Sequence, residues 1–183
     1  VAATGLLDGA EAVIYGGVGN DTIAAGHVET DEEEVTGFGD VNVTVFGGQG
    51  ADDIEVVTDG EAVIYGGIGK VDPDDDGDTI FFAGAGAFEV YGNGGDDCVI
   101  GWLQDGAEAA IYGGKGDDIV VAAGLSLGVP VPPDDLGDIV GLSEMLDKVD
   151  LSLLGGEGQD LILALTNGTA KIYGGTDRND PED

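Results

Sequence analysis

The chain has 183 residues, with 38 acidic residues against five Lys and Arg, so its formal net charge is −33. This charge excludes nucleic acids and anionic membrane surfaces as partners, because their phosphates would be repelled. A hydrophobic content of 42% argues against disorder. The lone Cys98 excludes an intrachain disulfide, and no long apolar run predicts membrane insertion. We therefore expect one domain over residues 1–183 whose acidic groups are neutralised by cations once it is folded.

A loop motif recurs along the chain: Gly-Gly-x-Gly-x-Asp, with an aliphatic residue two positions after the Asp. Four copies are complete, at Gly16–Ala24, Gly47–Glu55, Gly113–Val121 and Gly155–Leu163. Gly92–Ile100 is a near copy, and Gly66–Lys70 opens a copy that an insertion interrupts. Pro133–Gly141 keeps the Asp and the aliphatic residue but has lost the glycines, and Gly174–Asp180 has Asn179 in place of the Asp. Most copies lie 19 to 22 residues apart once insertions at about 27–39 and 71–77 are removed, and a third insertion is expected at about 124–150. A repeat of this period is typical of stacked, solenoid-like folds.

Two short strands are predicted in each repeat, one before the loop and one after it, because apolar and other residues alternate there with period two. In chain order they are Ala12–Tyr15, Thr22–Ala25, Val43–Phe46, Asp53–Val56, Ala62–Tyr65, Thr79–Phe82, Phe88–Tyr91, Cys98–Gly101, Ala109–Tyr112, Ile119–Ala122, Leu151–Leu154, Leu161–Ala164 and Ala170–Tyr173.

Aligning the repeats produces two apolar columns that we expect to face inward. One column lies in the strands after the loops and contains Ile23, Ile54, Ile80, Val99, Val120, Val140 and Ile162. The other lies in the strands before the loops and contains Ile14, Val45, Ile64, Val90, Ile111, Leu153 and Ile172. One strand–turn–strand unit cannot bury its own apolar face, but about eight stacked units bury both columns between two parallel sheets. The sequence therefore predicts an all-β protein, a parallel β-roll of about eight coils.

The two edges of such a roll differ in chemistry. One edge carries short Asx-Gly turns, at Asp8-Gly9, Asp59-Gly60, Asp105-Gly106 and Asn167-Gly168, which we expect to need a positive φ and little else. The other carries the glycine-rich loops, whose sixth-position Asp residues form the column Asp21, Asp52, Asp78, Asp97, Asp118, Asp138 and Asp160. Glycines let several backbone carbonyls aim at one point, and carboxylate and carbonyl oxygens are ligands that suit calcium. We expect several Ca²⁺ ions in a single file between successive loops.

These loops resemble the RTX (repeats-in-toxin), or haemolysin-type, calcium-binding β-roll family, whose nonapeptide GGxGxDxUx four loops match in full. The resemblance covers about residues 8–180 and implies a right-handed roll, calcium-dependent folding and secretion. It also implies that the calcium ligands are the sixth-position Asp residues and loop carbonyls, here those of Gly17, Gly19, Gly48, Gly50, Gly67, Gly69, Gly95, Gly114, Gly116, Gly156 and Gly158. In the family, nonapeptides commonly follow in tandem with calcium on both edges, whereas here they alternate with Asx-Gly turns. The insertion before Asp78 and the missing glycines before Asp138 place those two sites in question.

Three weaker patterns have alternative interpretations. The insertion reads D-x-D-x-D-G from Asp72 and predicts either an extra calcium bound by Asp72, Asp74 and Asp76 or a solvated acidic loop. An aromatic column just before the glycines is either a stacked ladder that stabilises the sheet or a surface for another subunit or a sugar; its members are Tyr15, Phe46, Tyr65, Tyr91, Tyr112 and Tyr173. Helical spacing of apolar residues predicts a short helix at Ser143–Lys148.

The function that these patterns favour is a calcium-binding structural module of a secreted or cell-surface protein. The start at Val1, without a Met or a signal peptide, predicts part of a larger protein. The alternatives are a subunit that assembles end to end, or with other cell-surface components, into a filament, surface layer or adhesin, and an accessory region of a secreted enzyme. His27 is the only histidine and no nucleophile–base pair is recognisable, so we expect no enzyme activity.

Overall fold

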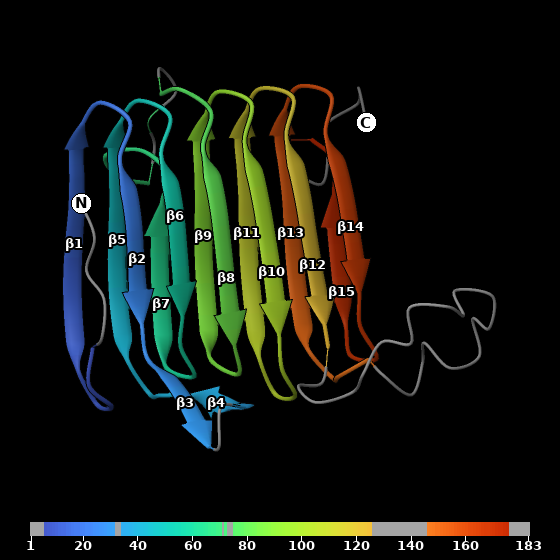
Figure 1. The fold of residues 1–183 in the computed structure, drawn as a ribbon. Helices are drawn as coiled ribbons and strands as arrows, with labels where there is room; N and C mark the ends of the chain where they lie inside the picture. Colours follow the sequence, from blue (N-terminus) through green and yellow to red (C-terminus); the bar gives the residue numbers. More distant parts are fainter. Residues whose placement is uncertain (1–5, 32–33, 71, 73–74, 126–145, 176–183) are drawn as a thin grey trace.

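The computed structural model describes residues 6–31, 34–70, 72, 75–125 and 146–175. Within them the protein is all-β, with two parallel sheets that face each other and a small antiparallel hairpin at one edge (Figure 1). The chain alternates between the two sheets, so neighbouring strands in a sheet come from successive repeats. No helix in these residues is long and apolar enough to cross a membrane.

The seven-stranded sheet has the order β1-β5-β7-β9-β11-β13-β15 and contains the strands that precede the loops. Their bounds are β1 Glu11–Val18, β5 Asn42–Gln49, β7 Glu61–Tyr65, β9 Ala87–Gly94, β11 Glu108–Lys115, β13 Asp150–Glu157 and β15 Ala170–Tyr173. The six-stranded sheet has the order β14-β12-β10-β8-β6-β2 and contains the strands that follow the loops. Their bounds are β2 Thr22–Gly26, β6 Asp53–Val57, β8 Thr79–Gly84, β10 Cys98–Leu103, β12 Ile119–Gly124 and β14 Leu161–Leu165. All thirteen predicted strands are confirmed.

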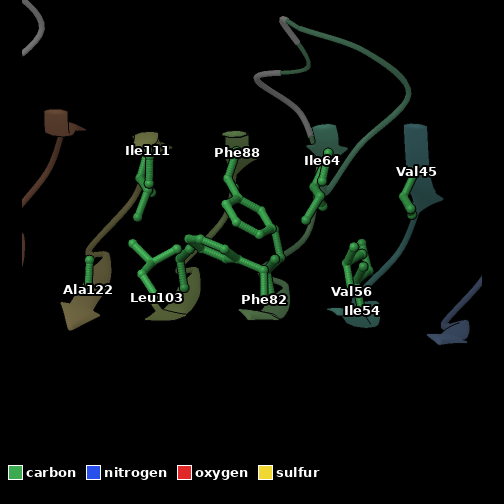
Figure 2. Packing of buried hydrophobic residues seen from close by; sticks show 14 of the residues in the cluster. Val45, Ile54, Val56, Ile64, Phe82, Phe88, Leu103, Ile111 and Ala122 are labelled. Atoms are coloured by element: carbon green, nitrogen blue, oxygen red, sulfur yellow. The ribbon is translucent and has the colours of Figure 1, made fainter. Parts of the chain in front are cut away.

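The register places equivalent residues of successive repeats side by side, as in the pairs Ile64↔Val90 and Ile54↔Ile80. Both predicted columns therefore point into one core between the sheets (Figure 2). Two members differ: Ile172 is 48% exposed in the last strand of its sheet, and Val140 lies outside the described residues. Each buried aliphatic side chain contributes roughly 1.5–3 kcal/mol, so these columns are the main apolar stabilisation of the fold.

Two phenylalanines from opposite sheets pack against each other in the core. Phe82 of β8 and Phe88 of β9 have ring centroids 4.9 Å apart, in a tilted arrangement (Figure 2). Phe82 also extends toward the next strand of its own sheet, where the inward position is Gly101. A Cβ on Gly101 would lie 2.5 Å from Phe82 Cζ, so glycine is needed there to accommodate the ring.

Five aromatic rings of the predicted column stack along the larger sheet. The centroids of successive rings are 4.8 to 5.1 Å apart in the order Tyr15, Phe46, Tyr65, Tyr91 and Tyr112. Leu154 follows Tyr112 in the register and separates it from Tyr173. This finding favours the interpretation as a stabilising ladder.

The insertion at 27–39 forms the hairpin of β3 (Val28–Asp31) and β4 (Glu34–Phe38), which was not predicted. At 124–150, by contrast, the sheets have no place for a further repeat between the loops at Gly113 and Gly155. There β11 pairs directly with β13 and β12 with β14, so no strand pair lies between them, and the degenerate copy at 133–141 is outside the described residues. In the described residues the larger sheet has the seven strands predicted for it, one fewer than the expected count of about eight coils. The predicted helix at 143–148 is wrong where it is described, because Leu146 forms an antiparallel bridge with Leu125 and residues 147–149 are not helical.

The turns at the Asx-Gly edge require glycine for two different reasons, of which only the positive φ was predicted. Gly9 and Gly106 have the expected positive φ, of +75° and +89°, but Gly60 and Gly168 do not. At those two turns glycine is needed for another reason, because a Cβ would lie 2.7 Å and 2.2 Å from a carbonyl oxygen of a neighbouring repeat.

A threonine precedes each of these two close-packed turns and organises its hydrogen bonds. The hydroxyl of Thr58, which is fully buried, accepts from Val41 N at 3.0 Å and from Gly60 N at 2.9 Å, and it donates to the Val41 carbonyl at 2.6 Å. Thr166 makes the same contacts with Val149 and Gly168. The two threonine hydroxyls therefore provide hydrogen-bond partners for backbone N–H groups at these turns.

Candidate metal centre at the glycine-rich edge

The sixth-position aspartates of the loops form a continuous hydrogen-bonded ladder along the opposite edge. In each step, the backbone N–H of one Asp donates to Oδ1 of the corresponding Asp in the next repeat. The distances are 2.7 Å for Asp21 to Asp52, 2.7 Å for Asp52 to Asp78, 2.7 Å for Asp78 to Asp97, 2.9 Å for Asp97 to Asp118 and 3.1 Å for Asp118 to Asp160. One oxygen of each accepting carboxylate is thus committed to holding successive loops in register.

The second carboxylate oxygen has no partner in the middle of this ladder. Asp52, Asp78, Asp97 and Asp118 are only 1 to 3% exposed, and in each the buried Oδ2 receives no hydrogen bond. In the described residues, every buried side-chain polar atom without a partner lies on this edge, except Gln104 Nε2. A buried, unpaired carboxylate is strongly unfavourable in its charged form, so burial favours either protonation of these groups or a cation bound beside them.

The pKa values of these four carboxyl groups are raised, mainly by their burial. Burial, with a smaller effect of the neighbouring acids, raises the pKa of Asp97 to about 8, that of Asp78 to about 7 and that of Asp118 to about 6. Burial also raises the pKa of Asp52. A positive charge on this edge would lower all four values, because it would favour the ionised forms.

A backbone carbonyl of the next loop faces each unpartnered oxygen. A Cβ built on Gly92, the first glycine of its loop, would lie 2.3 Å from Asp97 Oδ2 and 2.3 Å from the Gly113 carbonyl oxygen. The same pair of oxygens surrounds the first glycines Gly47, Gly66, Gly113 and Gly155. Each loop junction thus brings a carboxylate oxygen and a backbone carbonyl oxygen near one point, and the carbonyls of Gly66 and Gly174 also accept the N–H groups of Gly48 and Gly156. This is the donor set that a hard cation prefers.

The second and fourth loop positions require glycine for conformational reasons. In the complete loops both have a positive φ, from +95° to +137°, at Gly17, Gly19, Gly48, Gly50, Gly114, Gly116, Gly156 and Gly158; Gly95 has +91°. A Cβ on Gly114 would also lie 2.0 Å from the carbonyl oxygen of Asn93 in the preceding loop. The three glycines of the motif thus allow a left-handed backbone and close stacking of loop on loop.

The interrupted loop completes the ladder in spite of its insertion. Asp78 accepts from Asp52 and donates to Asp97, so it occupies the sixth position like its counterparts. Gly67 and Gly69 differ from other loop glycines, because neither has a positive φ. Of the residues predicted for an extra calcium loop, Asp74 lies outside the described residues and Asp76 is exposed. Asp75, which was not predicted, has both carboxylate oxygens buried without a side-chain partner. Burial and the charge of Asp72 raise its pKa to about 6, against the lowering effect of the backbone N–H groups of Asp76 and Gly50.

The hydrogen-bonded ladder passes over one member of the predicted Asp column. Asp138 and Asn179 lie outside the described residues, and the ladder passes directly from Asp118 to Asp160. A second, partial ladder was missed. At the fifth position Asp117 N donates to Asp96 Oδ1 at 2.9 Å, and Gln159 N donates to Asp117 Oδ1 at 2.8 Å. The Asp-Asp pairs at 96–97 and 117–118 were the available signal.

The arrangement can hold a cation only through a mixture of carboxylate and carbonyl oxygens. No three His, Cys, Asp or Glu side chains in the described ranges converge into a ready-made metal site. The four junctions at Asp52, Asp78, Asp97 and Asp118 instead each offer one unpartnered carboxylate oxygen and the carbonyl oxygen of the next loop's first glycine, an oxygen set that fits calcium and does not fit zinc. Comparisons with protein-family models, with curated proteins and with solved structures find no match to the chain.

Proposed function

We propose that this chain is a calcium-binding structural module in which Ca²⁺ ions lie in a single file between the glycine-rich loops. The observation that supports it most is the set of four buried Oδ2 atoms, in Asp52, Asp78, Asp97 and Asp118, that have no partner and face carbonyl oxygens. We further propose that the two sheets are the faces of a right-handed parallel β-roll, as in the RTX family that the loops resemble.

Calcium would supply the positive charge that this edge lacks. Asp52, Asp78, Asp97, Asp118 and Asp160 would contribute Oδ2, and the loop glycines would contribute carbonyls. The other edge supports a one-sided file: its turn carboxylates also accept backbone N–H groups, as Asp8 does from Asp40 and Asp59 from Ala85, but among the described residues neither Asp8 nor Asp59 has a buried oxygen without a partner.

The energy available from such a file is large enough to control folding. Extracellular calcium is near the millimolar range, and sites with dissociation constants of about 10⁻⁴ M would each stabilise the fold by roughly 1.4 kcal/mol. The five steps of the ladder would then contribute about 7 kcal/mol, which is comparable to the whole stability of an ordinary domain. We therefore propose a secreted or cell-surface location and a structural, non-catalytic role.

Circular dichroism of the full chain in millimolar calcium and after removal of calcium by EGTA tests this proposal. We expect the β signal in calcium to be lost in EGTA and regained when calcium is added back, whereas magnesium alone restores little of it. A β signal that persists unchanged in excess EGTA contradicts the proposal.

A second candidate is assembly through the ends of the sheets, and apolar exposure there favours it. At one end Val13 and Tyr15 of β1 are 60% and 64% exposed, and at the other Leu161 of β14 and Ile172 of β15 are 62% and 48% exposed. Edge strands with exposed apolar side chains favour pairing with another chain. Light scattering at rising protein concentration in calcium tests this role, and particles of constant monomeric mass contradict it.

A further inference from the structure

Asn93 is unusual in both its backbone and its side chain. It occupies the second loop position, and among the described residues it is the only non-glycine residue with a positive φ, +85°. Its side chain is 8% exposed, yet neither Oδ1 nor Nδ2 has a hydrogen-bond partner. A strained backbone and an unsatisfied buried amide together indicate a role beyond packing.

The stacking of the loops shows where the Asn93 side chain points. At Gly48, Gly114 and Gly156, a Cβ on the second residue would lie 2.0 Å from the carbonyl oxygen of the second residue of the preceding loop. By analogy with this stacking, the side chain of Asn93 would be directed toward Gly67, the second residue of the interrupted loop. Gly67 does not have the positive φ of its counterparts, so this junction differs in backbone conformation from the others.

Two carboxylates approach Gly67 from the insertion. A Cβ on Gly67 would lie 2.5 Å from Asp75 Oδ2 and 3.0 Å from Asp72 Oδ2. Both oxygens of Asp75 are buried, and no side chain donates to them, although the backbone N–H groups of Asp76 and Gly50 lie near enough to interact with the carboxylate. Asp72 and Asn93 also line one pocket of about 340 Å³, together with Tyr91 and Tyr112. Asp72, whose Oδ2 also accepts from Ile68 N at 3.3 Å, thus lies near Asp75 at Gly67 and shares the pocket with Asn93, whereas Asp75 does not line that pocket.

Two lysines, Lys70 and the exposed Lys115, line this pocket, and Lys70 is committed to other groups. Lys70 lines the same pocket, but its Nζ lies 3.3 Å from Glu89 Oε1 and 4.8 Å from the centroid of the Tyr91 ring. Glu89 in turn accepts a hydrogen bond from the Tyr91 hydroxyl. Lys70 is therefore held on the outer face of the sheet, and no side chain donates a hydrogen bond to Asp75.

We propose that Asp72, Asp75 and the side-chain carbonyl of Asn93 bind one additional divalent cation, specific to the interrupted loop. Two carboxylates and an amide carbonyl, completed by water, form an oxygen set that suits calcium. The identity of the ion rests on the proposed function, but the site itself does not belong to the repeated ladder. It also replaces the ligand set expected from the D-x-D-x-D-G pattern, since Asp75 takes the place of Asp74 and Asp76.

Calorimetric titration of the calcium-stripped full chain with CaCl₂ tests the site with three variants. Asp75→Asn removes a carboxylate, and Asn93→Gly removes the amide while restoring the residue that other loops have at this position. Asp76→Asn is the control, because it removes the same charge from an exposed neighbour. We expect Asp75→Asn and Asn93→Gly each to bind one calcium fewer than the wild-type chain, and Asp76→Asn to bind the wild-type number.

Terbium luminescence provides a second readout, because Tyr91 and Tyr112 line the pocket and would excite a bound Tb³⁺. The component of this signal that arises at the pocket should be lost in Asn93→Gly. Wild-type stoichiometry in both Asp75→Asn and Asn93→Gly, or an equal loss in Asp76→Asn, overturns this site while leaving the ladder proposal intact. A wild-type chain that binds no calcium overturns both.

Discussion

Replacing Asp97 by Asn separates the two roles that its carboxylate has at the glycine-rich edge. Oδ1 accepts from Asp78 N at 2.7 Å, whereas Oδ2 is buried without a partner. Burial, together with the charges of Asp118 and Asp78, raises the pKa of Asp97 to about 8. In the calcium-free fold at pH 7, Asp97 must therefore keep a proton that the unfolded chain releases. With an unperturbed pKa of about 3.9, this costs the fold about 4 kcal/mol.

An Asn at this position removes that cost and keeps the hydrogen bond from Asp78. Its amide would also face the Gly113 carbonyl, because Asp97 Oδ2 and that oxygen lie 2.3 Å from the same point beside Gly92. We expect Asp97→Asn to stabilise the calcium-free chain by up to about 4 kcal/mol at pH 7. In calcium the sign should reverse, because the variant lacks a charged ligand.

The assay is circular dichroism of calcium-stripped and calcium-loaded protein, recorded as a function of pH and of urea concentration. Without calcium, Asp97→Asn should keep its β signal to a higher pH than the wild-type chain. In calcium, it should need more calcium to fold and less urea to unfold. A variant that is less stable than wild type by the same amount in both conditions would refute the reasoning, because the buried charge would then not be the cause.

Three further predictions concern glycine, the opposite edge and pH. Gly114→Ala should destabilise the fold by roughly 3 kcal/mol or more, because the φ of Gly114 is +124° and a Cβ there would lie 2.0 Å from the Asn93 carbonyl oxygen. Gly69→Ala is the control: Gly69 has open space around it and no positive φ, so the urea midpoint should not change. Thr58→Val should cost roughly 2–3 kcal/mol in urea unfolding, by orphaning two backbone N–H groups, without changing calcium affinity in calorimetry; a loss of affinity would contradict this separation of the edges. Because folded-state pKa values on the ladder are raised to about 6–8, the stability of the calcium-free chain should be greatest below about pH 4 and decline as the pH rises to about 8; a stability that rises over this interval in urea titrations would be inconsistent with buried, unneutralised carboxylates.

The regular part of the fold could be predicted because the same pattern of apolar and loop residues recurs in successive repeats. Alternation of apolar residues places Ile54 and Ile64 inward in their strands, and the same alternation recurs in register from repeat to repeat. The spacing of the loops then aligns the aspartates, so the ladder from Asp21 to Asp160 follows the predicted column except at Asp138. Local pattern and global stacking agree here, which is why the sequence was informative.

The parts that could not be predicted depend on tertiary contacts that the repeat pattern does not indicate. The copy at 133–141 resembles a loop, but the direct pairing of β11 with β13 is a property of the whole sheet. Thr58 becomes important only because Val41 of a neighbouring repeat presents both its N–H and its carbonyl to the hydroxyl. The carboxylate oxygens of Asp75 are buried where this side chain lies against Gly67, whereas spacing alone favoured Asp74 and Asp76. In each case tertiary packing selects among residues that look equivalent in the sequence.

The central claim is that cations occupy the junctions between the glycine-rich loops and no comparable positions on the opposite edge. Crystals of the full chain grown in calcium, with anomalous scattering measured at long wavelength, test it most directly. We predict a single file of calcium peaks beside the ladder from Asp52 to Asp160, each in contact with a carboxylate Oδ2 and with carbonyls of two loops. Peaks along both edges, or none beside the ladder, would contradict it.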